Sequence, residues 1–470
     1  MPKLESYNPA TGEKIWEGDA ASVDAVHKAV DAARRAFPAW AALSLNERIA
    51  CVERFRAVVE QKRDILAETI SKEMGKPLWD TRGEVTGVVN KVAISVAAYQ
   101  ERTPQKSSTQ NHIVNRLIHK PHGVMAVFGP YNFPAHLPNG HIVPALLAGN
   151  TVVFKPSEET PLVAETYVAF WKEAGLPEGV LNVVQGGRDT GIALAASDID
   201  GILFTGSWET GKKLHEGVAG RPEILLALEM GGNNPLVVWE PKDLDITAQL
   251  IVQSAFMSSG QRCTCARRLI LPGGKEGDAV LDALTALVSR IRVGAYTDNP
   301  EPFMGPLVSL KQAENLLAAQ DMLRQAGGKS IVDMQPLESG KPFLTPGIID
   351  VTGAQRSDRE FFGPLLQVIR VKDFESALAE ANNTKFGLAA GLISKKEDLW
   401  QQFLTQSRAG IVNWNRQTTG AASNAPFGGV GHSGNHRPSA YYAADYCAWP
   451  VASMGTPTPA SETIVGVNPV

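Results

Sequence analysis

The sequence predicts an α/β protein with parallel sheets, divided into at least two units. Three observations point to this class. The chain has 470 residues, too many for one compact hydrophobic core. Between residues 120 and 230, short β-branched runs alternate with segments of helical periodicity, and a second alternation follows over residues 232–430. Each alternation predicts a parallel sheet covered by helices on both faces.

Residues 20–100 precede the first alternation and predict helices. Ser44 and Glu47 form an S-x-x-E pattern, which is typical of a capping box at a helix start. Apolar residues then recur at helical spacing. Gly75 and Pro77 predict the end of a helix.

The first alternation predicts five strands with four helices between them. The predicted strands are 123–130, 150–156, 180–186, 201–207 and 224–230, and the helices are 139–149, 160–175, 190–197 and 210–220. Sheets of this kind bind ligands beyond the carboxyl ends of their strands.

The second alternation predicts another α/β unit. Its helices are expected near 244–260, 276–292 and 309–327, and its strands near 235–239, 267–272 and 365–371. The aromatic-rich run 439–453 predicts a strand, and the tail 455–470 an extended segment.

Bulk composition excludes several functional classes. A net charge of -4 gives no reason to expect binding to nucleic acid or to an acidic membrane. No apolar run reaches the roughly 18–20 residues of a membrane span, and the first residues lack a signal-peptide core. Four cysteines in a chain of this length are not a disulfide framework, so a cytoplasmic protein with reduced thiols is expected.

Two of these cysteines, Cys263 and Cys265, lie one residue apart within residues 256–268. The spacing does not suit a C-x-x-C metal site, so no metal is expected, and a disulfide between them would be strained. Buried structural thiols and a reactive thiolate both remain open from these residues alone. Gly260 suits a flexible turn that exposes the next residues of the chain, and Arg262 adds positive charge that favours a thiolate.

A strand-to-helix turn at residues 204–211 contains Gly206 and Gly211. Backbone N–H groups at such a helix start can hold a phosphate. The sequence contains no G-x-G-x-x-G pattern, and most glycine-containing turns bind nothing, so this signal is weak alone.

Four residues in separate stretches suit one reaction: Asn132, Glu229, Cys263 and Glu360. A thiolate that attacks a carbonyl creates an oxyanion, which a neutral amide such as that of Asn132 can stabilise. Hydrolysis of the resulting thioester requires a base, and hydride loss requires a nicotinamide. Taken singly, Asn132 could be a turn residue and either glutamate a solvated carboxylate.

Together these stretches resemble the NAD(P)-dependent aldehyde dehydrogenase superfamily, from YNPATGE at residue 7 to APFGGVGHSG ending at 434. LEMGGNNP resembles its glutamate signature, and FMSSGQRC its cysteine signature. The resemblance implies the aldehyde dehydrogenase fold. That fold has a Rossmann-like NAD-binding domain (1–104 and 121–231), an α/β catalytic domain (232–433) and a small β oligomerisation element (105–120 and 434–470).

The resemblance also implies roles for individual residues. Cys263, not Cys265, is the nucleophile. Asn132 and the Cys263 N–H hold the oxyanion, and Glu229 is the base for deacylation. The implied cofactor is NAD, preferred over NADP because Glu158 would repel a 2′-phosphate. The implied cofactor-binding residues are Lys155, Glu158, Gly206, Ser207, Gly211, Glu360 and Phe362.

Longer stretches narrow the resemblance to members that oxidise N-succinylglutamate 5-semialdehyde in arginine catabolism: 129–158, 227–235, 259–268, 409–415 and 434–450. Such a substrate carries carboxylates, which arginine binds well. The candidates are Arg262, Arg416 and Arg437, with at least one of the first two expected to set specificity. Arg267 and Arg268 are expected to form structural ion pairs.

Two alternatives remain open. The chain could oxidise another carboxylated or aliphatic semialdehyde, or it could be a non-redox cysteine hydrolase or acyl-transfer enzyme. The second requires a histidine partner, and no histidine accompanies the cysteine motif. In either case the expected partner is a small-molecule aldehyde or acyl compound. A homodimer or homotetramer is expected.

Overall fold

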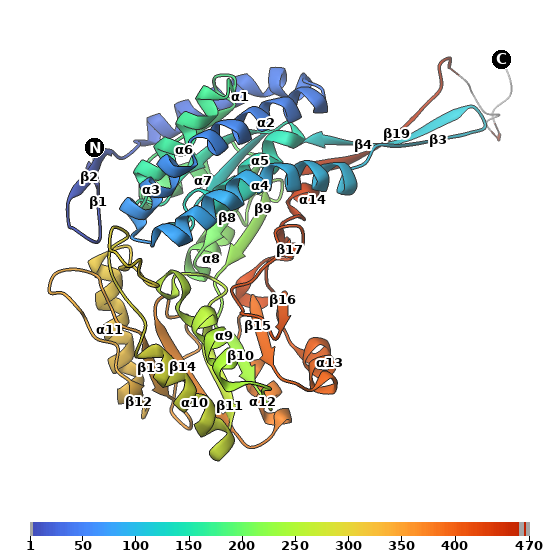
Figure 1. Ribbon diagram of the computed structural model, residues 1–470. Coiled ribbons are helices and arrows are strands. Elements are labelled where there is room, and N and C mark those ends of the chain that lie inside the picture. Colours follow the sequence, from blue (N-terminus) through green and yellow to red (C-terminus); the bar gives the residue numbers. More distant parts are fainter. Residues whose placement is uncertain (1–2, 460–464, 467–470) are drawn as a thin grey trace.

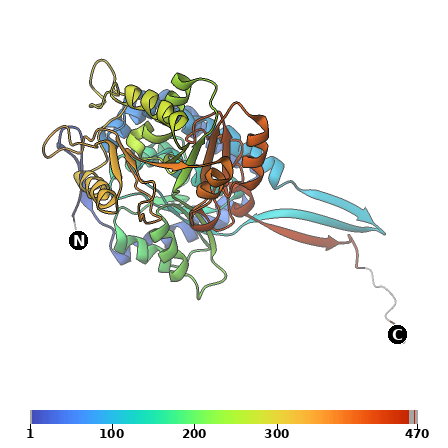
Figure 2. The same cartoon turned by 90° about the horizontal axis from the view of Figure 1, so that it is seen from below.

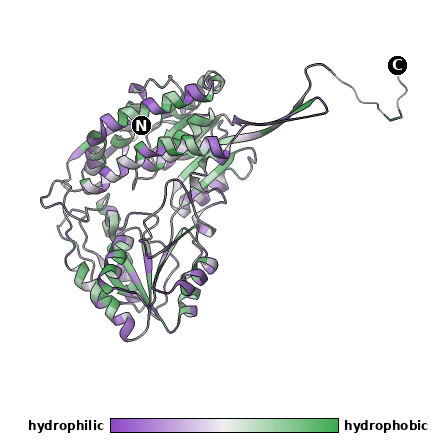
Figure 3. Ribbon diagram, turned by 45° about the vertical axis from the view of Figure 1, so that its right-hand side comes forward, coloured by the Kyte–Doolittle hydropathy of each residue, from purple (hydrophilic) through white to green (hydrophobic). Residues whose placement is uncertain are grey.

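Two large sheets organise the chain in the computed structural model, which describes residues 3–459 and 465–466. Each sheet lies in its own lobe, and a three-stranded arm projects from the upper lobe (Figure 1). Hydrophobic residues concentrate in the two sheets and on the helix faces that pack against them (Figure 3). Within the described residues, no helix is long and apolar enough to cross a membrane.

The first sheet has five strands, all parallel, in the order β7-β6-β5-β8-β9. All five confirm predicted strands: β5 (Val124–Phe128), β6 (Thr151–Lys155), β7 (Leu181–Val183), β8 (Gly201–Gly206) and β9 (Leu225–Met230). The chain builds outward in one direction from β5 and then returns to add β8 on the other side. The carboxyl ends of β5 and β8 therefore flank the crevice where such sheets bind ligands.

Helices cover both faces of this sheet, as the pattern predicted. Alternate side chains of β5 point to opposite faces. Met125 and Val127 join the core formed with α2 to α6, and Val124 and Ala126 join the core formed with α1, α7 and α8. The helices are α1 (Val23–Ala42), α2 (Leu45–Gln61), α3 (Arg63–Met74), α4 (Leu78–Arg102), α5 (His136–Ala148), α6 (Pro161–Glu173), α7 (Arg188–Ala196) and α8 (Trp208–Gly217).

The predicted helix boundaries near residues 44 and 75 are confirmed. Ser44 caps α2, and its side chain and that of Glu47 form both hydrogen bonds of the capping box. Gly75 ends α3 at φ 87°, a left-handed conformation that glycine adopts without strain. Pro77 then precedes α4.

The second sheet has seven strands in the order β12-β13-β14-β11-β10-β15-β16, and only the β12–β13 pair is antiparallel. Its strands are β10 (Asn234–Val238), β11 (Ala266–Pro272), β12 (Lys329–Val332), β13 (Gly347–Asp350), β14 (Leu365–Val371), β15 (Ala389–Ile393) and β16 (Ile411–Trp414). The helices around it are α9 (Leu244–Phe256), α10 (Lys275–Val288), α11 (Leu310–Gln325), α12 (Phe374–Ala381) and α13 (Glu397–Gln406). The strands and helices predicted here are confirmed.

The arm consists of β3 (Lys106–Gln110), β4 (Ile113–Pro121) and β19 (Ala448–Gly455), paired antiparallel. Figure 2 shows it extending well away from both lobes. Two shorter hairpins complete the chain: β1 (Lys3–Tyr7) with β2 (Lys14–Asp19), and β17 (Pro426–Phe427) with β18 (Ser439–Ala440).

The prediction of one strand over 439–453 is wrong. Residues Ala443–Cys447 form the helix α14, and only the part from Ala448 onward is the strand β19. Ala443, Tyr446 and Cys447 are spaced to share one helical face, and they are buried in the core with α4 and α5. Most of the predicted extended tail, 455–470, lies outside the described residues.

Candidate active site

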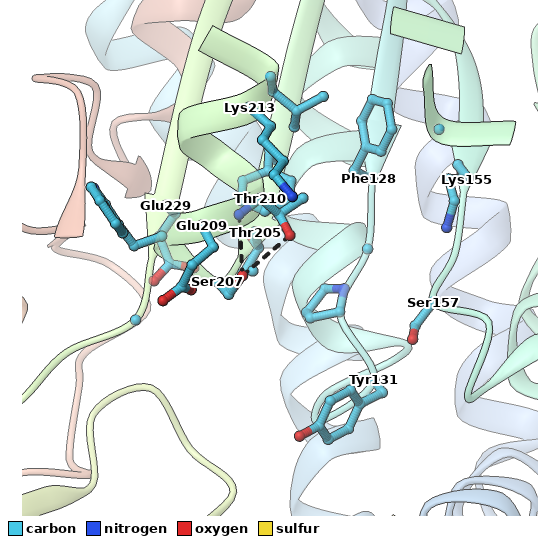
Figure 4. Close-up of a pocket in the computed structure, with 18 of the residues that line it drawn as sticks. Phe128, Tyr131, Lys155, Ser157, Thr205, Ser207, Glu209, Thr210, Lys213 and Glu229 are labelled. Atoms are coloured by element: carbon cyan, nitrogen blue, oxygen red, sulfur yellow. Dashed lines mark hydrogen bonds between the residues drawn. The ribbon is translucent and has the colours of Figure 1, made fainter. Parts of the chain in front are cut away.

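A cavity of about 950 Å³ opens at the carboxyl ends of β5, β6, β8 and β9, against loops of the second lobe. Figure 4 shows Tyr131, Lys155 and Ser157 on one side of it and Ser207, Glu209 and Thr210 on the other. This large cavity brings together most of the residues that the sequence singled out. They are Asn132, Lys155, Glu158, Gly206, Ser207, Glu229, Cys263, Glu360 and Phe362.

A second cavity, of about 490 Å³, lies on the other side of Cys263. The two cavities share Leu137, Thr205 and Cys263 as lining residues. The second is walled mainly by α4, α5 and the loop 419–423. Cys263 therefore lies where two separate binding spaces meet, and a molecule in either one can reach its thiol.

A tight turn presents Cys263. Ser258, Ser259 and Gly260 all have positive φ, of 52°, 56° and 72°. For the two serines this conformation costs on the order of 1–3 kcal/mol each. A Cβ at Gly260 would lie 2.1 Å from the carbonyl oxygen of Gly363, so only glycine fits there. The turn is buried and held by hydrogen bonds, such as that from Ser259 Oγ to the Gly305 carbonyl at 2.7 Å. The expected turn is present, but it is not flexible.

The expectation that Arg262 favours a thiolate is also wrong. Its guanidinium donates to the buried Asp80 carboxylate at 2.7 Å, so its charge is already neutralised. Burial raises the pKa of the Cys263 thiol well above its usual value, and the nearby Glu229 and Glu360 carboxylates raise it further. Cys263 is partly exposed, whereas Cys265 is buried with its sulfur 3.8 Å from the Met257 carbonyl oxygen. The resting side chain at residue 263 is therefore a thiol that needs a base.

Glu229 supplies a candidate base. It lies near the end of β9, in register with Thr205 on β8, and it is 3% exposed. Neither carboxylate oxygen has a hydrogen-bond partner within the described residues. Burial raises the pKa of Glu229 to about 8, and the side chains of Thr205 and Cys263 partly offset this rise. A carboxylate with this pKa can exchange a proton near neutral pH.

Asn132 follows β5 and is buried in the same wall. Its amide nitrogen donates to the Gln261 carbonyl at 3.0 Å, which ties it to the cysteine loop. Lys76 holds it from behind, donating to the Asn132 carbonyl at 2.9 Å and to Glu84 at 2.6 Å. Both members of this ion pair are buried. The sequence reasoning missed the pair, because the partners of Lys76 lie elsewhere in the chain.

Glu360 and Phe362 enter the large cavity from the loop before β14. Gly231 permits this approach, because a Cβ there would lie 1.8 Å from a Glu360 carboxylate oxygen. Burial raises the pKa of Glu360 to about 7, and the Arg267 charge partly offsets the rise. Arg267 lies 3.5 Å from that carboxylate and 5.3 Å from the Phe362 ring centroid. The expected ion pair thus orients cavity residues.

Arg268 forms the purely structural ion pair that was expected. It is buried in β11 and lies 3.3 Å from Glu380. It also donates to the carbonyl of Asn233 at 2.9 Å and to that of Ala381 at the same distance. These contacts bind α12 to the sheet and do not reach either cavity.

The remaining glycine and arginine predictions fare differently. Gly211 does not line the large cavity: a Cβ there would lie 2.4 Å from the Met230 sulfur, so this glycine lets α8 pack closely on the sheet. Arg416 and Arg437 are exposed and line neither cavity, so the structure does not bring them to the site. Arg262 does line the second cavity, but it is paired with Asp80.

Comparisons with known proteins agree with this arrangement. The family model for the aldehyde dehydrogenase family matches residues 2–449. An N-succinylglutamate 5-semialdehyde dehydrogenase of Pseudomonas fluorescens strain Pf0-1 is 60% identical over 457 residues, covering 97% of this chain and 94% of that protein. PnpE from Pseudomonas sp. WBC-3 has a TM-score of 0.92 at 31% identity, covering 99% of this chain and 96% of its own.

PnpE has also been crystallised in complex with nicotinamide adenine dinucleotide. An NADP-dependent enzyme of E. coli has a TM-score of 0.91 at 30% identity, covering 97% of this chain and 95% of its own. The match of the family model spans nearly the whole chain, and the solved structures share its fold throughout. This protein is a member of the aldehyde dehydrogenase family.

Proposed function

We propose that this protein oxidises N-succinyl-L-glutamate 5-semialdehyde to N-succinyl-L-glutamate, with NAD as the electron acceptor, in arginine catabolism. The observation that carries the proposal is the 60% identity, over 97% of the chain, to a dehydrogenase of that name. The geometry supports it, because Cys263 faces one cavity large enough for a dinucleotide and a smaller one suited to an acyclic aldehyde.

In this proposal Cys263 attacks the aldehyde carbon from the second cavity and forms a thiohemiacetal. The thiol proton goes to Glu229, whose pKa of about 8 suits that exchange. The Asn132 amide and the Cys263 N–H stabilise the oxyanion. After oxidation to the thioester, Glu229 accepts a proton from water, and the hydroxide expels the Cys263 thiolate with release of the acid product.

The large cavity fits a dinucleotide. The start of α8 directs its free N–H groups there, with Ser207 as the N-cap, which suits a pyrophosphate. Lys155 and Glu158 lie 3.6 Å apart at the end suited to the adenosine ribose, and Glu360 and Phe362 lie near Cys263. When bound, the nicotinamide supplies the hydride acceptor. The Glu158 carboxylate opposes a 2′-phosphate, which favours NAD over NADP.

Two alternatives make different demands on the site. Oxidation of another carboxylated or aliphatic semialdehyde would use the same residues and differ only in the second cavity. A non-redox cysteine hydrolase would need a histidine on the thiol. His136 and His141 do line the second cavity, but no hydrogen bond joins either to Cys263 in the described part of the chain. Burial lowers the pKa of both well below the usual value, to about 4 and about 3.

A panel of aldehydes with NAD, followed by NADH absorbance, tests the proposal. We expect kcat/KM for N-succinylglutamate 5-semialdehyde to exceed that for butyraldehyde and for succinate semialdehyde. A preference for butyraldehyde would overturn the substrate and leave the reaction class intact. Release of acid from a thioester without any NADH formed from aldehydes would favour the hydrolase.

We also propose that the chain acts in the cytoplasm as a homodimer or homotetramer, joined through the arm. Trp449 and Met454 on β19 are 62% and 72% exposed, which is unusual for large apolar side chains on a projecting strand. Light scattering after size-exclusion chromatography tests the assembly, and a monomer at micromolar concentration would refute it.

A further inference from the structure

The second cavity contains a buried cation without a partner. Lys91 on α4 lines this cavity, is 2% exposed, and its ammonium has no hydrogen-bond partner within the described residues. The other charged side chains of this wall are paired: Arg262 with Asp80 at 2.7 Å, and Glu84 with a lysine behind it. An unpaired buried charge is costly, so its presence calls for a counterion.

Glycines open the helix face on which Lys91 lies. Gly83, Gly87 and Lys91 are each four residues apart on α4, so they share one face, and all three line the second cavity. A glycine inside a helix costs about 1 kcal/mol relative to alanine. A Cβ at Gly83 would meet nothing within 4 Å, so this glycine borders open space in the cavity. At Gly87 a Cβ would lie 2.9 Å from the His136 ring.

The opposing helix leaves space as well. Gly140 of α5 lines the same cavity, and a Cβ there would lie 3.8 Å from Lys91 Cε. The lysine side chain has a flexible stem, so its ammonium can turn within a space bounded by these glycines. The groups nearest to it are uncharged: burial holds His136 and His141 neutral by lowering the pKa of each, and the Cys447 thiol is kept protonated because burial raises its pKa.

We propose that Lys91 is the residue that binds a substrate carboxylate in the second cavity, and so selects carboxylated aldehydes. This inference rests on the proposed function, whose substrate keeps two carboxylates beside its aldehyde. A carboxylate bound by Lys91 would give the buried ammonium its missing counterion, which makes the contact strong. Burial lowers the pKa of Lys91 to about 8, so the free enzyme still holds it mostly charged at neutral pH.

Arg262 is the other cation of this cavity, and it is poorly placed for the same task. Its Nη2 donates to Asp80 at 2.7 Å and its Nε donates to Ser258 Oγ at 2.8 Å. A substrate carboxylate there would lie beside the Asp80 carboxylate, which repels it. The two cations therefore make a matched pair for experiment, since one is free and the other is already neutralised.

The test is Lys91→Met, compared with wild type on the succinylated semialdehyde and on butyraldehyde. Methionine matches the length of the stem and removes an unpaired buried charge, so the variant should fold at least as stably. We expect kcat/KM for the succinylated substrate to fall about 10–100-fold, mostly through KM, with butyraldehyde changed less than about twofold. N-succinylglutamate should also inhibit the variant less well as a competitor of the aldehyde.

Three comparisons make the result decisive. Arg262→Ala should lower both substrates by a similar factor, and Lys91→Gln should behave like Lys91→Met. The N-acetyl analogue keeps only the α-carboxylate: a retained penalty in Lys91→Met assigns that carboxylate, and a lost penalty assigns the succinyl one.

The outcomes that overturn the inference are distinct from those that overturn the proposed function. If Lys91→Met lowers both aldehydes equally, or leaves inhibition by N-succinylglutamate unchanged, Lys91 does not bind the carboxylate. If the wild-type enzyme itself prefers butyraldehyde, the proposed function fails first, and the inference fails with it.

Discussion

The two cavities that meet at Cys263 treat charge in opposite ways. In the large cavity, Glu229 has no hydrogen-bond partner, and Glu360 lies at a loose 3.5 Å from Arg267. Burial raises the pKa of both carboxyls, to about 8 and about 7. In the second cavity, Arg262 and Asp80 neutralise each other at 2.7 Å. Tightly paired charges build the walls, whereas charges left unpaired are available to exchange protons or bind ligands.

The largest effect is expected at the residue that both cavities share. Cys263→Ser should lower dehydrogenase turnover on the order of 10⁴-fold or more, because a serine hydroxyl without strong activation is a poor nucleophile. Cys265→Ser is the matched control, since that thiol is buried outside both cavities and should leave substantial activity. Steady-state NADH formation measures both. An active Cys263→Ser enzyme would move the chemistry to another residue.

Glu229→Gln tests the unpaired carboxylate of the large cavity. If Glu229 serves deacylation, the variant should release about one NADH per site in a burst and then turn over about 10²–10⁴-fold more slowly, because an amide cannot take a proton from water. Stopped-flow absorbance at the NADH band measures burst and steady state together. Loss of the burst as well would show that Glu229 is needed earlier, to accept the Cys263 proton.

The pH dependence sharpens the same point. A base whose pKa is about 8 is mostly protonated at pH 7 and gains its active form as the pH rises. Where deacylation limits turnover, kcat should therefore rise about tenfold per pH unit below about pH 8 and level off above it. Glu229→Gln should abolish this limb. A limb that persists in that variant would belong to another group, such as Glu360.

The smallest effect is expected at the rim of the large cavity. The Glu158 side chain is 53% exposed, so water screens its repulsion of a 2′-phosphate. Glu158→Gln should raise the kcat/KM ratio of NADP to NAD by about 2–5-fold. Parallel assays with the two cofactors measure the ratio. A wild-type enzyme that uses NADP as well as NAD would remove the basis for this prediction.

The sequence predicted most of the fold because its signals are local. Alternating β-branched runs and helical periodicity gave every strand of the first sheet, and the S-x-x-E pattern at Ser44 gave the start of α2. The failure at 439–453 is instructive. Aromatic residues favour a strand there, but burial of Ala443, Tyr446 and Cys447 against α4 and α5 favours a helix.

The sequence also identified the residues that the large cavity brings together, because the signature motifs carry them as short continuous stretches. Pairing between distant residues left no such signal. Arg262 looked like a free cation beside the nucleophile, yet its partner Asp80 lies 182 residues away. Lys91 looked like an ordinary helical lysine until the fold enclosed it beside Gly87 and Gly140.

By itself, then, the sequence determined the class of fold, the family and the residues that carry its motifs, since these depend on periodicity and local order. Only the tertiary structure decided which charges are neutralised and which stay free. That outcome depends on burial and on partners brought together from distant parts of the chain. It assigned Arg262 to the wall, left Glu229 unpaired beside Cys263, and enclosed Lys91 in the second cavity without a counterion.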